Sequence, residues 1–299
     1  MISNKKYFEV SFPNVPKPVV DVWRCLVGYL EASGCLPSSF IFQQITGHPE
    51  RFQSERDLKV SHEEVADLIQ NRDLFGFAVD TGHSARSVAF SMTKAKTTGD
   101  QTVLSCRIEC QSKTPADWSR LIEGLLSLWP GIGGWQWDNL YKVWQGTISE
   151  NVYEANFGAI PPGVRMVGGG GLGGHGKPKR KFIDVSLNPG RAKELLPMVN
   201  FYPSSEMWLG PHFWQYASCT KQEVLDSDIF LIKRDLPNFL YLKTWPEPFR
   251  RPDGEQGRIQ QKLWRLLFHE DCEWPPSSGG ISDKPIYGPP ELMPRDEIA

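Results

Sequence analysis

Hydrophobic side chains recur at two different spacings along the first half of the chain, and each spacing predicts a different element. Alternation of apolar and polar residues predicts strands, which fall at residues 7–12, 75–80, 87–94 and 102–109. Spacings of three and four predict a helix over residues 19–30, ended by Gly34, and a second helix that carries Trp118 and Trp129. Because only short polar turns separate the last three strands, we expect them to form an antiparallel meander.

The second half of the chain has similar ingredients. A strand is predicted at residues 182–187, followed by a helix that opens at Asn188-Pro189. Two short strands at residues 229–232 and 239–242 flank a turn, and a last helix begins behind Asp253. A capping box, which marks the first turn of a helix, occurs at Ser61 and again at Thr220, each with Glu three residues later.

Each half therefore combines a few strands with helices, without the strict strand–helix alternation of a parallel sheet. We predict an α+β fold with two small antiparallel sheets, each packed with helices and joined by a glycine-rich loop. The expected division is an N-terminal α+β domain at 1–165, a basic glycine-rich linker at 166–181, a C-terminal α+β domain at 182–274 and a Pro/Gly-rich tail at 275–299.

The glycine-rich run separates two acidic regions. The net charge is −3 for residues 1–160, +5 for residues 161–181 and −4 for residues 182–299. Gly176-Lys177 is followed by Pro178 instead of the Ser or Thr of a phosphate-binding loop, and the segment behind it indicates a strand instead of a helix. A mobile interdomain loop is the first interpretation, and contact between the basic cluster and a polyanion is the alternative.

Composition places the chain among soluble globular proteins. Of its 299 residues, 40% are hydrophobic and the net charge is −2, which argues against a dedicated nucleic-acid binder. No apolar stretch reaches the length of a membrane span, and the first residues show no secretory signal. The six cysteines form no Cys-x-x-Cys pair, so we expect reduced thiols, a cytoplasmic location, and no metal or cofactor.

Candidate catalytic residues are few. Glu50, Asp57 and Lys59 imitate the carboxylates and lysine of a restriction-type, metal-dependent nuclease, although they lie in a charged stretch that is typical of a solvated loop. The six histidines are scattered, and no Gly-x-Ser-x-Gly motif is present. A metal-dependent hydrolase is therefore an alternative to a binding protein.

The eleven tryptophans are the more conspicuous feature. Trp135 and Trp137 alternate as in a strand, so that both indoles lie on one face. An aromatic, proline-bounded stretch at 201–214 contains Trp208, His212 and Trp214 and is predicted to be irregular. Such rings pack in cores, anchor a protein partner, or form a sugar-binding platform, and the last use would take Trp135, Trp137 and Trp208.

The chain resembles the immunity protein 52 family of bacterial polymorphic-toxin systems in its length, its α+β elements and two aromatic stretches, 135–144 and 207–214. The resemblance implies a cytoplasmic protein, linked to type VI secretion and interbacterial competition, that neutralises a nuclease toxin. It would do so by occluding the toxin's site or by breaking the toxin's active assembly.

The leading hypothesis is therefore a non-enzymatic immunity protein whose partner is a cognate nuclease toxin, with no membrane or direct nucleic-acid partner. The acidic residues behind the last helix would speed association with a basic partner. The aromatic residues would supply anchors that become buried in the complex. The predicted partner-binding residues are Trp135, Trp137, Trp208, His212, Trp214, Glu270, Asp271 and Glu273.

Overall fold

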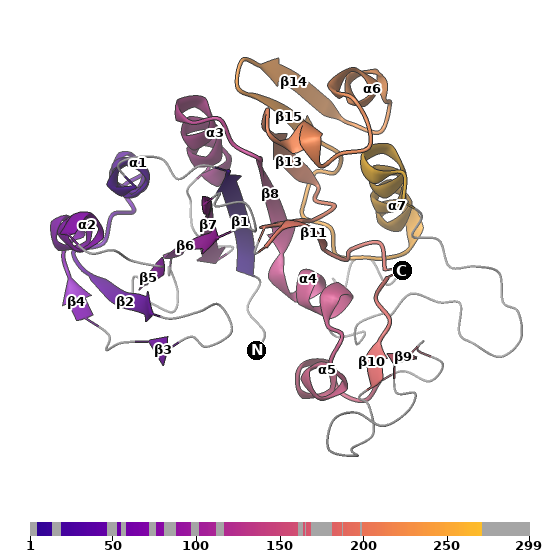
Figure 1. Ribbon diagram of the computed structural model, residues 1–299, viewed down its shortest axis with the longest axis horizontal. Coiled ribbons are helices and arrows are strands. Elements are labelled where there is room, and N and C mark those ends of the chain that lie inside the picture. The colour runs from indigo at the N-terminus through magenta and orange to yellow at the C-terminus, as the bar shows by residue number, and fades with distance from the viewer. Residues whose placement is uncertain are drawn as a thin grey trace, which may run out of the picture.

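One large antiparallel sheet runs through the computed structural model (Figure 1). The described residues are 5–13, 19–46, 53–54, 58–71, 76–80, 88–96, 102–111, 117–160, 164, 166–168, 181–186, 188–197 and 199–270. Among them, ten strands follow one another in the order β14-β15-β13-β8-β1-β7-β6-β5-β2-β3, and β4 also pairs with β2. Their bounds are β1 Lys5–Phe12, β2 Phe40–Thr46, β3 Gln53–Ser54, β4 Leu58–Val60, β5 Gly76–Asp80, β6 Val88–Lys96, β7 Thr102–Gln111, β8 Gly133–Asp138, β13 Glu206–Leu209, β14 Ile232–Leu236 and β15 Phe239–Lys243.

The prediction of two small sheets is wrong, because strands from both halves of the chain share backbone hydrogen bonds. Strand β13 pairs antiparallel with β8 on one side and with β15 on the other. The predicted meander is confirmed as β5, β6 and β7, but it continues through β1 and β8 into the C-terminal strands. The α+β composition itself holds. The domain boundaries at 165, 181 and 274 stay a prediction.

Three helices cover one face of the N-terminal strands (Figure 1). They are α1 Val20–Ala32, α2 His62–Asn71 and α3 Trp118–Leu128. The capping box at Ser61 is confirmed, since the Ser61 N–H donates to Glu64 Oε2 at 2.7 Å and the Glu64 N–H donates to Ser61 Oγ at 3.2 Å. Gly34 follows α1 with φ +64°, a left-handed conformation that favours glycine.

A second hydrophobic cluster lies on the other face of the C-terminal strands and contains residues of the remaining helices. These helices are α4 Asn139–Gly146, α5 Glu150–Phe157, α6 Lys221–Asp226 and α7 Gly254–Phe268. The predicted capping box at Thr220 is confirmed at the start of α6. Strand β8 gives way to α4 because the Asp138 carboxylate accepts a hydrogen bond from the Tyr141 N–H at 3.0 Å.

Strand register places most of the apolar side chains of the two halves on opposite faces of the same sheet. On the face toward α1, α2 and α3, one row of neighbouring residues reads Phe42, Val79, Phe90, Ile108, Phe8, and then Gln136, Glu206, Lys243. On the face toward α4 and α7, the adjacent row reads Gln43, Ala78, Ser91, Arg107, Glu9, and then Trp135, Met207, Leu242. Apolar and polar positions therefore exchange faces between β1 and β8.

Two short hairpins lie outside the main sheet. Strand β9 Met166–Gly168 pairs with β10 Lys181–Ile183, so the two ends of the glycine-rich run are hydrogen-bonded to each other. The run between them, 169–180, lies outside the described residues. Strand β11 Lys193–Leu196 pairs with β12 Val199–Phe201, which corrects the predicted helix behind Asn188. In the described part of the chain, no helix is long and apolar enough to cross a membrane.

Candidate functional site

The three tryptophans of the central strands are interior. Trp135 and Trp208 are 0% exposed and Trp137 is 5% exposed. Trp135 and Trp137 share one face of β8, as predicted, and belong to the cluster with α4 and α7. Trp208 lies on the opposite face, in the cluster with α3. The aromatic stretch is therefore not irregular throughout, because it contains the central strand β13. Burial of these indoles removes the basis for a sugar platform or for direct surface anchors.

His212 precedes a short 3₁₀ turn, η2 Phe213–Gln215, that contains Trp214, and both side chains are half-buried. Phe213 between them is fully buried against Phe268 of α7, with ring centroids 6.1 Å apart. The segment is fixed further by Ser218, whose N–H donates to the Leu267 carbonyl at 2.8 Å and whose hydroxyl donates to the Phe268 carbonyl at 3.1 Å. This turn is thus held against the C-terminal end of α7.

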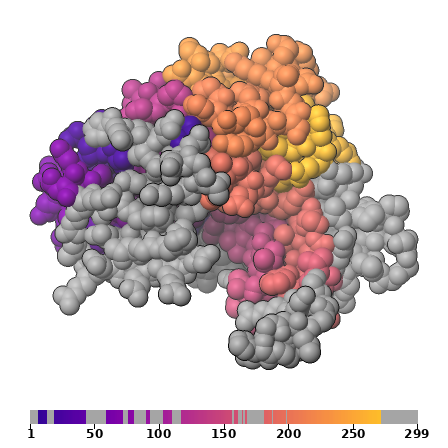
Figure 2. Space-filling model, in the orientation of Figure 1, coloured from indigo at the N-terminus to yellow at the C-terminus, as the bar shows by residue number. Residues whose placement is uncertain are grey.

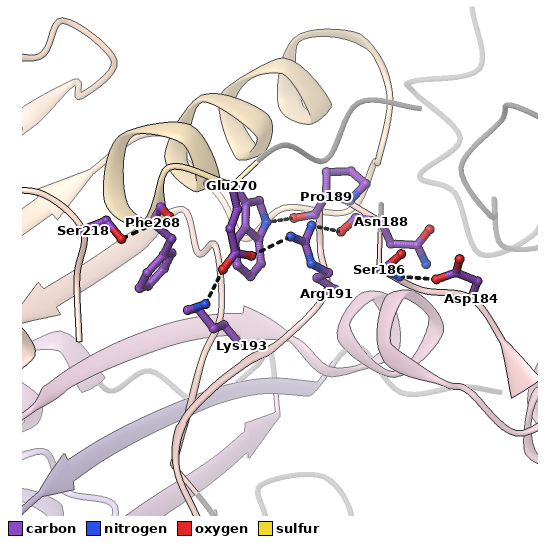
Figure 3. Close-up of polar contacts among 10 residues, drawn as sticks. Asp184, Ser186, Asn188, Pro189, Arg191, Lys193, Ser218, Phe268 and Glu270 are labelled. Carbon is purple, nitrogen blue, oxygen red and sulfur yellow. Dashed lines mark hydrogen bonds and ion pairs between the residues drawn. The ribbon is translucent and has the colours of Figure 1, made fainter. Parts of the chain in front are cut away.

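Glu270 lies at the same end of α7 (Figure 3). The helix ends at His269, which has left-handed φ 52° and ψ 30°, and its N–H donates to the Arg265 carbonyl. The Glu270 carboxylate pairs with Arg191 at 3.0 Å and also with Lys193. These two cations offset the unfavourable position of a carboxylate near a helix C-terminus. Asp271 and Glu273, the other predicted acidic residues, lie outside the described residues.

The segment that carries the two cations is itself anchored on α7. Trp264 Nε1 donates to the Pro189 carbonyl at 2.9 Å, and the Arg191 guanidinium lies 3.8 Å from the centroid of the Trp264 ring. The Lys193 ammonium lies 4.9 Å from the centroid of the Phe268 ring. Cation–π contacts of this kind order long side chains that would otherwise lose rotamer entropy on binding a partner.

We call six residues the α7-terminal surface: the partly exposed His212, Trp214, Tyr216 and Glu270, and the exposed Glu223 and His269. Backbone and side-chain hydrogen bonds of Thr220 lower the pKa of Glu223, and His269 contributes to the same shift, so Glu223 is ionised at neutral pH. The structure thus brings His212, Trp214 and Glu270 to one end of one helix, whereas Trp135, Trp137 and Trp208 lie inside the sheet. The surface offers aromatic area and carboxylates for binding.

A buried charged cluster at the changeover between β1 and β8 was not predicted. Glu9 is 1% exposed, and its Oε2 accepts a hydrogen bond from the Arg107 guanidinium at 3.3 Å. Lys142 of α4 lies over Trp137 and Tyr202, 4.5 Å and 4.4 Å from the ring centroids. Burial and then the positive charge of Arg107 lower the pKa of Lys142 to about 8. Glu9 is polar in an alternating strand, which indicates a solvent-facing position, and only the tertiary structure shows that it is buried.

The pocket beside Lys142 is small. Its walls include Trp137, Tyr141, Lys142, Tyr202 and Phe249, and it has room for little more than one water molecule. A substrate would not fit there. Among the described residues, no group of three or more His, Cys, Asp or Glu could hold a metal ion. Of the predicted nuclease residues, Lys59 is exposed on β4, while Glu50 and Asp57 lie outside the described residues.

Comparison with known proteins gives a likeness of fold. No family model matches the chain. A search of curated proteins also finds no match. Among solved structures, the Pseudomonas aeruginosa T6SS (type VI secretion system) protein PA0821 is similar, with a TM-score of 0.50 and 10% sequence identity. The match covers 94% of this chain and 79% of that protein. At this identity, the likeness concerns the fold alone.

Proposed function

We propose that this chain is a cytoplasmic immunity protein that binds and neutralises a cognate nuclease toxin without catalysing a reaction itself. The observation that carries the proposal is the shared fold with a T6SS protein over nearly the whole chain. The resemblance to the immunity protein 52 family suggests the same setting. Neutralisation would follow from occlusion of the toxin's site or from disruption of its active assembly.

The α7-terminal surface fits such a role on physical grounds. Trp214 and Tyr216 are partly exposed aromatic residues, a residue type that contributes much contact area at little entropic cost. Glu223 and Glu270 add negative charge, which favours approach of a basic protein. Hydrogen bonds from Ser218 and the ion pairs of Glu270 hold this surface in place before any partner arrives. A preorganised surface loses less conformational entropy on binding.

The test is to identify any nuclease-like protein that is encoded beside the gene for this chain and to combine the two purified proteins. We expect a stable complex by size-exclusion chromatography, loss of DNA cleavage as the complex reaches stoichiometric amounts, and restored growth when both proteins are produced in one cell. A toxin that stays fully active at a large excess of this chain would reject the proposal, as would intrinsic nuclease activity of the chain with Mg²⁺ or Mn²⁺.

A matched pair of variants locates the surface. Trp214→Ala should weaken toxin binding by about 30-fold or more if the indole is an anchor worth about 2 kcal/mol. Trp129→Ala is the control, because Trp129 is another half-buried tryptophan that packs on Phe12 in the other cluster. Equal effects of the two substitutions on affinity, in folded proteins, would place the toxin elsewhere.

A further inference from the structure

Strand β14 is the outermost strand at one end of the sheet, and Figures 1 and 2 show this orange segment at the upper rim of the molecule. Four of its five residues are exposed, from Ile232 to Asp235. In the described residues it pairs only with β15. An exposed edge strand presents unpaired backbone groups, and natural proteins usually protect such edges with charges or leave them short. This edge is short and carries Lys233, Arg234 and Asp235, but it begins with two exposed apolar residues, Leu231 and Ile232, at 64% and 44%.

The hairpin geometry fixes which backbone groups of β14 point outward. Leu236 and Phe239 flank a two-residue turn, so they form a hydrogen-bonded pair across the hairpin. Hydrogen-bonded pairs alternate along an antiparallel ladder, which makes Arg234 with Tyr241 the next one. The N–H and C=O groups of Lys233 and Asp235 therefore point away from β15 and are available to another strand.

The residue order of β14 is self-complementary. It reads Ile232, Lys233, Arg234, Asp235, Leu236. We propose that two copies of the chain associate through β14, paired antiparallel about a two-fold axis at Arg234, so that the two sheets become continuous. In this register Lys233 lies opposite Asp235 of the second copy, with opposite charges and with the outward backbone groups of both residues facing each other. Ile232 lies opposite Leu236 of the second copy.

Exposed apolar residues at the two ends of β14 fit the same register. Leu128, 59% exposed, lies at the end of α3, beside the turn that follows Leu236, because Asn238 Nδ2 donates to the Ser127 carbonyl at 2.8 Å. Antiparallel pairing brings the start of one β14 to the end of the other. Ile232 would then approach Leu128 as well as Leu236 of the second copy. Two of the large exposed apolar residues, Ile232 of one copy and Leu128 of the other, thus come together at each end of the paired strands.

The strand is braced for such pairing. On one face, Lys233 donates to the Ser227 carbonyl at 2.9 Å and Asp235 pairs with Lys221 of α6 at 2.5 Å. On the other face, Arg234 pairs with Glu123 of α3 and lies 4.2 Å from the Tyr241 ring centroid. Glu123 offsets the repulsion between the two Arg234 residues at the axis. A fixed edge strand loses little conformational entropy when a second strand is added.

Sedimentation velocity of the purified full chain, without any toxin, tests the proposal. The interface is small, so we expect a monomer–dimer equilibrium in the micromolar range. Ile232→Asp should weaken dimerisation at least about tenfold. Val152→Asp, which alters a similarly exposed apolar residue on α5, should leave it unchanged. Lys233→Glu and Asp235→Lys should each weaken the dimer, and the double exchange should restore it because opposite charges again face each other.

Cross-linking tests the register itself. At the axis, Arg234 of the two copies forms a non-hydrogen-bonded pair with Cα atoms about 4.5 Å apart, within the range that a disulfide spans. Arg234→Cys should therefore give a covalent dimer on oxidation, whereas Lys233→Cys and the wild type should not. A wild-type chain that stays monomeric at high concentration overturns the proposal, as does a dimer unaffected by Ile232→Asp. A monomer that loses toxin affinity on Ile232→Asp would assign this edge to the toxin.

Discussion

The two halves of the sheet bury most of their apolar side chains on opposite faces, although Trp208, Phe239 and Tyr241 of the C-terminal half pack on the N-terminal face. From β2 to β1, alternating strands bury Phe42, Phe90 and Phe8 against α1, α2 and α3. From β8 to β15, Trp135 and Leu242 are buried against the other layer of helices. The difference shows that a continuous sheet does not require a continuous core, because backbone hydrogen bonds join strands whatever face their side chains favour.

Between β1 and β8, where the apolar face changes sides, the mismatch between polar and apolar neighbours is relieved by local contacts. Polar residues of one half meet apolar residues of the other, and Glu9 and Arg107 pair there beside Trp135 and Trp137. Glycine also contributes, since a Cβ at Gly134 would lie 2.8 Å from Ile122 Cγ2 and 3.1 Å from the Glu9 carbonyl oxygen. Without a side chain at Gly134, α3 and the ring of Trp208 pack closely over strand β8 at this point.

We expect the largest effect when the chain is divided into its two halves. Fragments 1–176 and 177–299 should each be insoluble or unfolded when produced alone, and should copurify as a folded complex when produced together. The reason is that β13 and β15 complete the sheet next to β8, and separation would expose both clusters. Circular dichroism and co-elution provide the measurement. Two fragments that fold independently would show that the halves are autonomous despite their shared sheet.

Trp135→Ala and Trp208→Ala compare the two clusters at the changeover. Each indole is fully buried on its own face, so each substitution should lower the free energy of unfolding by about 3–5 kcal/mol. Because the strands are hydrogen-bonded into one sheet, we expect a single unfolding transition in both variants, measured by chemical denaturation with fluorescence and circular dichroism. Separate transitions, one for each cluster, would contradict cooperative unfolding.

Glu206 and Glu9 are buried carboxylates on opposite faces of the sheet, and their removal should lower the free energy of unfolding by different, smaller amounts. Glu206 accepts hydrogen bonds from the hydroxyls of Tyr241 at 2.6 Å and Ser119 at 3.2 Å. Glu206→Ala leaves these donors unpaired inside the protein and should cost about 2–3 kcal/mol. Glu9→Ala should cost less, because the side chain of Arg107 is 45% exposed and water can solvate it. Denaturant midpoints of the two variants, at matched slopes, rank them. A larger loss of stability for Glu9→Ala than for Glu206→Ala would contradict this prediction.

The pH dependence of stability offers the smallest and most specific test. The pKa of Lys142 is lowered to about 8 by burial, whereas an unfolded lysine titrates near pH 10.4. Between these values the unfolded chain binds more protons, so this residue makes stability rise as pH increases from about 8 toward 10. Lys142→Met should remove that contribution, which unfolding curves at several pH values would detect. An unchanged pH profile would mean that Lys142 is fully hydrated.

Local patterns predicted many elements correctly because the signals lie within a few residues. The capping boxes at Ser61 and Thr220, the meander and the last helix all follow from short-range spacing or hydrogen bonding. The helix expected behind Asn188 was wrong, since residues 193–196 pair with β12 and that contact is absent from any local pattern. Burial of Trp208 was equally hidden, because β13 is short and proline-bounded and becomes a strand only between β8 and β15.

For the candidate surface, the sequence by itself determined which residue types were available: aromatic rings at 201–214 and carboxylates behind the last helix. Tertiary structure decided which of them are accessible. It buries Trp135, Trp137 and Trp208, pairs Glu270 with Arg191 and Lys193, and leaves Trp214 partly exposed. The physical reason is that alternation assigns side chains to two faces of a strand, but the face that water reaches depends on which distant helices cover it.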